Sequence, residues 1–231
     1  MNRPLMMPRI PPLEQGDHLT RGEFERRYQA MPQVKKAELI EGVVYVPSPV
    51  RFGHHADPHG QMIGLLYVYN VHTPGTWMAT DGTVRMDMDN EVQPNGALFI
   101  DPACGGRVVI SDDDYVEGGP ELLAEIAAST VSIDLNKKLH VYRRNQVQEY
   151  VVWRVQDEAI DWFFLNEGHF DPMPKTEGIY HSRVFPGLWL DADALVRGDK
   201  LRVLTVLQQG IASAEHAAFV SRLRAAGAPK Q

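Results

Sequence analysis

The sequence predicts an α/β or α+β fold, in which helices cover the faces of a sheet. Helical and strand patterns follow one another along the chain, which is typical of a sheet flanked by helices. The 231 residues are 44% hydrophobic, which is enough for one good core with appendages. We therefore expect a main domain over residues 19–197, a Pro-rich arm at 1–18 and a helical extension at 198–231.

Regular structure should begin with a helix and then a turn between strands. "TRGEFERRYQAM" opens with a capping box made by Thr20 and Glu23, and its helix should end by Pro32. "KKAELIEGVVYVPSP" predicts either a pair of strands or one bent strand, with Gly42 at the bend. This part of the chain therefore contributes one short helix and one short region of sheet.

The middle of the chain predicts a helix followed by three strands. "GQMIGLLYVYNV" is expected to be helical because four apolar residues recur at helical spacing, namely Met62, Ile63, Leu66 and Tyr69. "TVRMDMD" alternates between apolar and polar residues, which favours a strand, and "ALFID" is the next strand. "LLAEIAA" is short and continuously apolar apart from its glutamate, so it is expected to be a buried strand.

The remainder predicts a helix, two strands and a helical tail. "SIDLNKKLHVYRRN" is the helix, and "QEYVVWRV" with "AIDWFFL" is the strand pair. In the tail from about residue 199, apolar residues at helical spacing predict a further helix, with Gly210 as the expected break before "AEHAAFVSRLRAA". These apolar residues are Leu201, Leu204, Leu207 and Ile211.

Charge and cysteine content restrict the class of protein. The formal charge of −7, from 30 acidic and 23 basic residues, argues against strong non-specific binding of polyanions, so any nucleic-acid contact should be local. The single cysteine, Cys104, allows no internal disulfide and suits a reducing compartment. Prolines interrupt the N-terminal stretch where a secretory signal would be apolar, and no run approaches the ~18 apolar residues of a membrane span. We expect a soluble, cytoplasmic protein with no membrane partner.

Glu125 is the first candidate site residue because it lies within the apolar run "LLAEIAA". An unpaired ionised carboxylate costs several kcal/mol to bury. A metal ion, a lysine or solvent exposure could each account for it. The following helix offers the lysine: at 100° per residue, Lys138 lies at the edge of the apolar stripe and Lys137 on the opposite side. That stripe consists of Leu135, Leu139 and Tyr142, with Ile133 and Val141 outside it. Asp134, one turn before Lys138, could pair with it.

Several short motifs around Glu125 follow one another along the chain in a characteristic order. Glu125 follows "PELLA" and precedes "ST" and a D-x-x-x-K-L-x-x-Y pattern that starts at Asp134. This arrangement resembles the Uma-two family of restriction endonucleases, a branch of the PD-(D/E)XK nuclease superfamily. Further landmarks agree: "LTRGEFERRYQ", "AELIEGVVYVPSP", His59 with "GQMIGLL", "QPN" and "VFPGLWL". The resemblance covers roughly Leu19 to Asp193 and implies a restriction endonuclease-like mixed sheet flanked by helices.

The resemblance implies a Mg²⁺- or Mn²⁺-dependent DNA endonuclease that hydrolyses phosphodiester bonds. The metal ligands it implies are Asn95, Glu125 and the backbone carbonyl of Ile126, with Glu38 as a second-metal or water-shell ligand and Glu41 as its nearby substitute. Ala127 stands where the superfamily usually has lysine, and Lys138 would replace that lysine from the helix. The implied catalytic residues are thus Glu125, Lys138, Asn95 and Glu38.

The sequence departs from the family at one position. Where the family's proline is followed by aspartate, this chain has Asn95, which is neutral, whereas Mg²⁺ sites rely on carboxylates and substrate phosphates. Asp101 would face the same side of the strand as Asn95, but it lies about 20 Å further along at ~3.3 Å per residue. Asp101 therefore cannot take the place of the family's aspartate. Two alternatives therefore stand beside the weakened nuclease. One is a catalytically inactive binding or regulatory module, and the other is a homo-oligomeric structural protein joined through its C-terminal helices.

Each site residue also has a plainer interpretation. Glu125 could pair with Lys138 without a metal, and Lys138 could be a helix lysine whose ammonium reaches solvent. Glu38 could form a surface pair with Lys35 or Lys36, and Asn95 could be a turn residue before Gly96.

Overall fold

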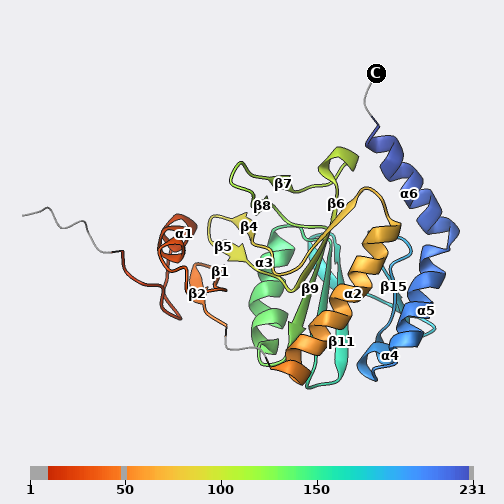
Figure 1. The fold of residues 1–231 in the computed structure, drawn as a ribbon, viewed down its shortest axis with the longest axis horizontal. Helices are drawn as coiled ribbons and strands as arrows, with labels where there is room; N and C mark the ends of the chain where they lie inside the picture. The colour runs from red at the N-terminus through yellow and green to blue at the C-terminus, as the bar shows by residue number, and fades with distance from the viewer. Residues whose placement is uncertain (1–9, 48–50, 229–231) are drawn as a thin grey trace, which may run out of the picture.

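The computed structural model describes residues 10–47 and 51–228, so residues 1–9 of the predicted arm lie outside it. It shows mixed sheets flanked by helices, with the C-terminal helices along one side (Figure 1). The predicted α/β fold class is confirmed. None of the helices in the described residues is both long enough and apolar enough to cross a membrane.

The described part of the chain forms helices of three kinds. The α-helices are α1 (Arg21–Gln29), α2 (Asp57–His72), α3 (Leu139–Arg144), α4 (Ala192–Val196), α5 (Lys200–Ile211) and α6 (Ala214–Ala226). Two π-helical segments, η1 (Phe52–Ala56) and η3 (Ile133–Lys138), lead directly into α2 and α3, and η2 (Pro102–Cys104) is a 3₁₀ turn.

The strands belong to three sheets. The main sheet has the order β12-β11-β10-β9-β6-β3, with β12 (His169–Pro172), β11 (Ala159–Asn166), β10 (Glu149–Arg154), β9 (Leu122–Ala127), β6 (Gly96–Ile100) and β3 (Thr76–Ala79). A second sheet has the order β2-β1-β5-β4-β8-β7, with β2 (Val43–Tyr45), β1 (Glu38–Ile40), β5 (Asn90–Val92), β4 (Val84–Asp87), β8 (Val116–Glu117) and β7 (Val109–Ile110). The third contains β13 (Lys175–Thr176), β14 (Ile179–His181) and β15 (Trp189–Asp191).

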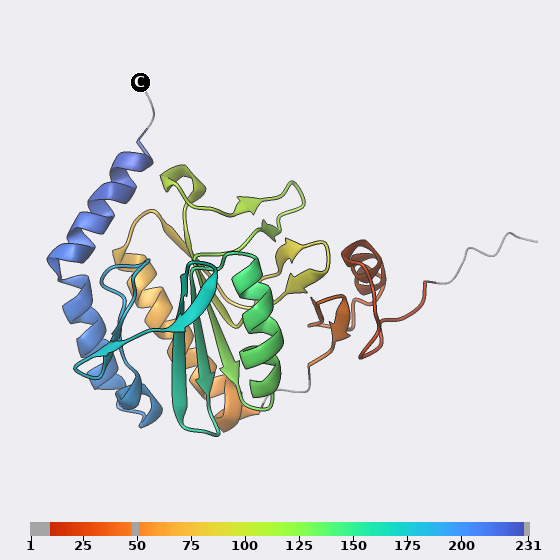
Figure 2. The ribbon, with the colours of Figure 1, turned by 180° about the vertical axis from the view of Figure 1, so that it is seen from behind.

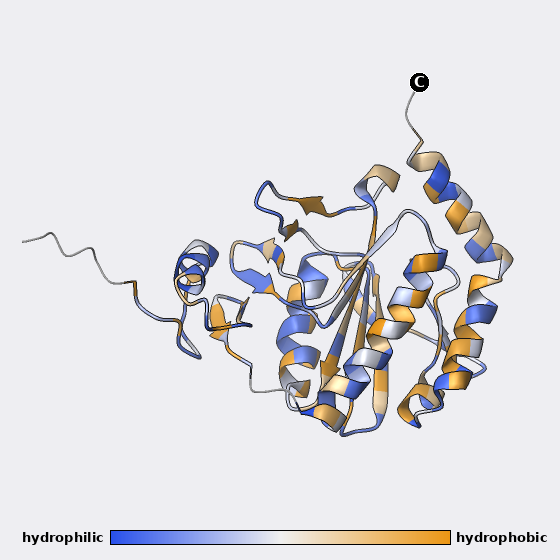
Figure 3. Cartoon of the chain, in the orientation of Figure 1, coloured by the Kyte–Doolittle hydropathy of each residue, from blue (hydrophilic) through white to orange (hydrophobic). Residues whose placement is uncertain are grey.

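The main sheet separates two hydrophobic clusters, and its central strands are largely apolar (Figure 3). β9 pairs with β10 in parallel and with β6 antiparallel. Side chains of α2, α4, α5 and α6 pack against one face. Val141 and Tyr142 of α3 pack against the other face, and Figure 2 shows this green helix and the blue C-terminal helices on opposite sides of the strands. Because successive strand residues point to opposite faces, Leu123, Glu125 and Ala127 of β9 all face α3.

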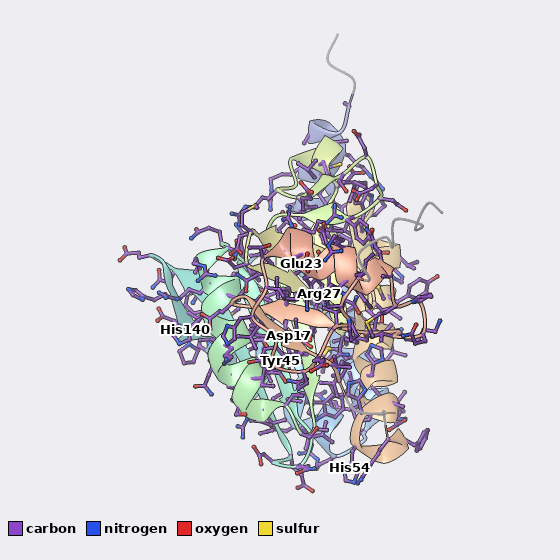
Figure 4. All side chains as sticks on the ribbon, turned by 90° about the vertical axis from the view of Figure 1, so that its left-hand side faces the viewer. Asp17, Glu23, Arg27, Tyr45, His54 and His140 are labelled. Atoms are coloured by element: carbon purple, nitrogen blue, oxygen red, sulfur yellow. The ribbon has the colours of Figure 1, made fainter. Side chains whose placement is uncertain are left out.

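Residues 10–47, called here the N-terminal unit, have a small core of their own. Leu13, Phe24 and Leu39 are among its buried members. Arg27 of α1 donates hydrogen bonds to Glu23 and to Asp17, which are labelled in Figure 4. β1 joins this unit to the rest of the second sheet through the pairing of Leu39 with Glu91 of β5.

The predicted opening helix and strand pair are confirmed. The Thr20 hydroxyl accepts a hydrogen bond from the Glu23 backbone N–H at 3.4 Å, and α1 ends before Pro32. β1 and β2 form a hairpin that turns at Glu41 and Gly42, whose φ angles are 53° and 73°. Glycine adopts such positive φ angles without steric cost, which explains its place at the bend.

The tail is helical as predicted. The buried face of α5 consists of Val203, Val206, Leu207 and Gly210, whereas Leu201 and Leu204 are 77% and 38% exposed. α5 continues one residue past Gly210, to Ile211, and α6 begins at Ala214, so the expected break lies just after this glycine. A Cβ atom at Gly210 would lie 2.2 Å from the carbonyl oxygen of Gly187, so this glycine permits a close backbone approach.

The homo-oligomer expectation can be tested at the leucines that α5 exposes. Leu204 borders a groove of about 530 Å³ between α2 and α5, and Leu201, one turn earlier on α5, is largely exposed. If α5 forms the interface, Leu201→Glu with Leu204→Glu should reduce the mass measured by light scattering to that of one chain, because charges would be buried. Gln208→Glu, also on an exposed position of α5, is the control. An unchanged mass in the double variant would exclude this interface.

Candidate active site

A buried lysine joins two carboxylates from different sheets. The Lys138 ammonium donates hydrogen bonds to Glu38 Oε1 at 2.9 Å and to Glu125 Oε1 at 2.8 Å. These side chains are only 5%, 10% and 5% exposed, respectively. Glu38 comes from β1, Glu125 from β9 and Lys138 from η3. The structure thus brings together three of the predicted site residues, and Glu125 is paired rather than exposed to solvent.

Asn95 lies beside Glu125 at the start of β6. β6 pairs with β9 up to Gly96 and Ala124, so Asn95 and Glu125 are the next opposed positions on the same face. The Asn95 side-chain oxygen accepts a hydrogen bond from the Ile126 backbone N–H at 2.9 Å. Asn95 is therefore more than a turn residue, because its amide continues the bonding between β6 and β9 past the end of the ladder.

The Ile126 carbonyl is placed by the same alternation. The Ala127 carbonyl accepts a hydrogen bond from the Val155 N–H, so Ala127 turns its backbone groups toward β10. Neighbouring residues of a strand direct these groups to opposite edges. The Ile126 carbonyl consequently points to the edge where Asn95 lies. Carboxylate, amide and carbonyl oxygens thus converge near the end of β9.

Glu38 and Glu41 have different surroundings. The Glu38 carboxylate accepts hydrogen bonds from Lys138 and from the Gln93 backbone N–H, both on Oε1. Glu41 lies exposed in the hairpin turn, where its N–H donates to Asn90, so it does not join the cluster. Lys36 pairs with Asp81 at 3.0 Å, which excludes the surface pair considered for Glu38 and this lysine.

The lysine helix differs from the straight α-helix that the sequence pattern assumed. Residues Ile133–Lys138 are π-helical, with bonds that span one residue more than those of an α-helix, and the inward face contains Asp134 and Lys138 rather than Leu135 and Leu139. Val141, which the pattern left outside the stripe, is fully buried, whereas Leu135 and Leu139 are only partly buried. The other inward positions are Asp134, Lys138 and Tyr142.

Lys137 points away from the cluster, as expected. Its ammonium lies 5.5 Å from the ring centroid of Tyr45, on β2. Figure 4 shows the labelled Tyr45 between α1 and α3. The two adjacent lysines thus have opposite environments, which makes Lys137 a matched control for Lys138.

Two tyrosines and a threonine complete the polar contacts of the cluster. The sequence patterns did not indicate roles for their hydroxyl groups. The Tyr142 hydroxyl donates to Glu125 Oε1 at 2.9 Å. The Thr130 hydroxyl donates to Asp134 Oδ2 at 2.6 Å, and the Tyr150 hydroxyl donates to the Asp134 carbonyl at 3.2 Å. Tyr142 was assigned to the apolar stripe, although its spacing of four residues from Lys138 places both on one helix face.

The cluster contains more negative than positive charge. Burial disfavours the charged form of Lys138, but Glu125, Glu38 and Asp134 outweigh this effect and hold the pKa of Lys138 well above its usual value. Burial raises the pKa of Asp134 to about 7, with Lys138 opposing and Glu125 adding to the shift. Burial and then Glu125 and Glu38 raise the pKa of Tyr142 well above its usual value, so its hydroxyl remains a donor.

Histidines border the cluster on the side of Asn95. His59 Nε2 is 3.0 Å from the Asn95 carbonyl oxygen, to which the Thr80 hydroxyl also donates. Burial, then His59 and Lys36, lower the pKa of His55, whereas Asp81 and a hydrogen bond with Asn95 act in the opposite direction. The contact of His59 with Asn95 is produced by the fold.

The donor set is compatible with one Mg²⁺ ion. Residues 10–47 and 51–228 contain no group of three or more His, Cys, Asp or Glu side chains placed to hold a metal ion. Mg²⁺ does not require such a group, because it usually binds through one or two carboxylates plus water and substrate phosphates. All hydrogen bonds that Glu38 and Glu125 accept from described residues end on Oε1, which leaves each Oε2 available. The excess negative charge also favours a cation.

Lys138→Met should destabilise the metal-free protein by about 3–5 kcal/mol near pH 8, because carboxylates would remain buried without their cation. A lysine whose pKa is raised on folding stabilises the fold below its unfolded-state pKa of about 10.4 and loses this effect only above it. The loss of unfolding free energy caused by Lys138→Met should be smaller at pH 5. Protonation there relieves the repulsion among carboxylates such as Asp134, whose pKa is about 7.

Denaturant unfolding of Lys138→Met at both pH values, with Lys137→Met as the control, measures this effect. An equal loss in the two variants, or a loss that is the same at pH 5 and pH 8, would contradict it.

The comparisons with known proteins concern the family and the fold. The family model described as "Uma2: Putative restriction endonuclease" matches residues 22–193. A solved structure, described as a "putative nuclease belonging to DUF820" from Anabaena variabilis, superposes with a TM-score of 0.56 at 11% identity, covering 74% of this chain and 97% of that one. It shares the fold. The comparison with curated proteins gives no match. The family resemblance found in the sequence is confirmed, and the chain belongs to the Uma2 family.

Proposed function

We propose that this protein is a Mg²⁺-dependent DNA endonuclease that hydrolyses phosphodiester bonds, with Mn²⁺ as a substitute ion. The observation that carries the proposal is the convergence of Glu38, Glu125 and Lys138 beside Asn95 and the Ile126 carbonyl. Membership of a family described as restriction endonucleases supports it. DNA is the proposed substrate, and the cytoplasm is the proposed location.

Each group has a distinct task in this proposal. Glu125 and Glu38 would hold the ion through their available Oε2 atoms, with oxygens of Asn95 and Ile126 beside them. When bound, the ion offsets charge on the phosphate and lowers the pKa of water. Lys138 polarises the attacking water and stays charged because its pKa is raised. Tyr142 holds Glu125 Oε1 and so fixes the direction of the carboxylate.

The inactive binding or regulatory module remains the second candidate, and Asn95 is the observation that favours it. An amide oxygen is a weaker Mg²⁺ ligand than a carboxylate because it carries no net charge. The Asn95 oxygen also accepts the Ile126 N–H, so it is already committed to holding two strands together. The two candidates share a fold and differ in whether the cluster hydrolyses DNA.

Cleavage itself is the first test. Purified protein with Mg²⁺ or Mn²⁺ should nick or cut plasmid DNA, and Glu125→Gln should reduce the rate at least ~100-fold, since loss of a preorganised charged group costs several kcal/mol. Glu158→Gln, at an exposed turn, should leave the rate unchanged. Thermal melting establishes that each variant is folded. Cleavage that persists in Glu125→Gln would come from another site or a contaminant, and absence of cleavage with both ions would favour the inactive module.

Asn95→Asp tests the weakest ligand. The aspartate can still accept a hydrogen bond from the Ile126 N–H and adds a negative charge beside the ion. Mg²⁺ affinity and cleavage should therefore both rise, and the affinity rises about 10-fold for each ~1.4 kcal/mol of added binding free energy. Adding Lys138→Met should abolish the gain in cleavage, because the lysine's task at the water remains necessary. Gln208→Glu adds the same charge on α5 and is the control.

Mass spectrometry of fresh and aged protein is needed alongside, because deamidation of Asn95 before Gly96 would reproduce the substitution. If Asn95→Asp binds metal more tightly without any cleavage, the inactive module is favoured. If neither property changes in a folded variant, this cluster is not a divalent-ion site.

A further inference from the structure

Asp134 is a third buried carboxylate near Lys138 to which the proposed chemistry gives no task. It is 2% exposed, and its Oδ1 lies 3.9 Å from the Lys138 ammonium, beyond hydrogen-bond range. Its other oxygen accepts the Thr130 hydroxyl, and its backbone carbonyl accepts the Tyr150 hydroxyl. Asp134 is thus held in place with one oxygen directed toward a lysine that is bonded elsewhere.

The same lysine is bonded to the two carboxylates that a metal ion would bind. Lys138 lies 2.9 Å and 2.8 Å from one oxygen of Glu38 and one of Glu125. A divalent cation on these carboxylates repels the ammonium and weakens its attraction to both. Because Lys138 is fully buried, it cannot turn to bulk water and needs another anionic partner inside the protein.

We infer that Asp134 is a positioning residue that receives the Lys138 ammonium when a divalent cation binds Glu38 and Glu125. This inference rests on the proposed function. A shift of about 1 Å brings Nζ from 3.9 Å to the usual hydrogen-bond length of ~2.9 Å. The lysine then remains charged and beside the cluster, instead of competing with the ion for the same two carboxylates.

The π-helical turn makes this exchange possible. Asp134 and Lys138 lie four residues apart within η3, on the inward face, and the wide turn separates them by slightly more than a hydrogen bond. Thr130 keeps Asp134 from moving to the lysine in the absence of the ion. Burial also raises the pKa of Asp134 to about 7, although Lys138 opposes the shift.

A double-mutant cycle on metal affinity tests the inference without using activity. Mn²⁺ affinity is measured by calorimetry for the wild type, Asp134→Asn, Lys138→Met and the double variant, at a pH where all are folded. Lys138→Met should bind Mn²⁺ more tightly than the wild type, because the competing cation is gone. Asp134→Asn should weaken binding about 10-fold when Lys138 is present, and no more than about 2-fold when it is absent.

Two further variants separate positioning from charge and folding. Asp134→Glu keeps an acceptor for the ammonium and should retain affinity within a few fold of the wild type. Asp112→Asn removes one charge from an exposed loop and should have no effect. The ¹⁵N signal of the Lys138 ammonium should shift on addition of Mg²⁺ in the wild type and shift less in Asp134→Asn.

The outcomes distinguish the inference from the function on which it rests. An equal weakening by Asp134→Asn in both backgrounds would show a simple charge effect and overturn the exchange. Weaker Mn²⁺ binding by Lys138→Met would show that the lysine does not compete with the ion, with the same consequence. If the wild type binds neither Mn²⁺ nor Mg²⁺, the proposed metal site fails and the exchange fails with it.

Discussion

The candidate site depends on one buried cation, the ammonium of Lys138, which compensates carboxylates from two separate sheets. Without it, Glu38 on β1 and Glu125 on β9 would carry like charges in a dry environment. Burying such a pair is expensive, and a well-packed apolar group is often no less stabilising. Stability alone is therefore a poor reason for this arrangement. Buried, strongly shifted titratable groups concentrate at functional sites, which favours the interpretation adopted here.

A comparison with Glu149 shows why Glu125 is the better candidate for chemistry. Glu149, on the neighbouring strand β10, is also buried, but within residues 10–47 and 51–228 it forms no salt bridge. Its two oxygens accept four hydrogen bonds, from Trp162, Ser182 and the backbone N–H groups of Arg183 and Val184. Both oxygens are thus occupied, and the residue fastens the segment before β15 to the main sheet. Glu125 keeps one oxygen available, which is what a metal ligand requires.

The sequence could predict much of this because local patterns determined it. The capping box at Thr20, the bend at Gly42 and the opposite directions of Lys137 and Lys138 all follow from one or two turns of chain. The failures have tertiary causes. Val141 is buried because it shares a helix face with the buried Asp134 and Lys138, and a stripe chosen from apolar residues alone did not include these two. Leucines at helical spacing predicted α5 but not its buried face, because the close approach of Gly210 to Gly187 is a tertiary contact that the spacing does not contain. The contacts of Asn95 with Ile126 and His59 join residues far apart in the chain, so no single-segment pattern could reveal them.

The separate core of the N-terminal unit has a consequence for cooperativity. Glu38 belongs to residues 10–47, whose apolar residues pack mainly with one another, whereas Glu125 and Lys138 belong to the main sheet and its helix. Regions with their own small cores open with lower free energies than the whole protein. A brief local opening of this region would withdraw one carboxylate while β9 and η3 stayed folded. The fraction of molecules with a complete site would then be governed by the local stability of residues 10–47, and the site would be lost well below the global melting temperature.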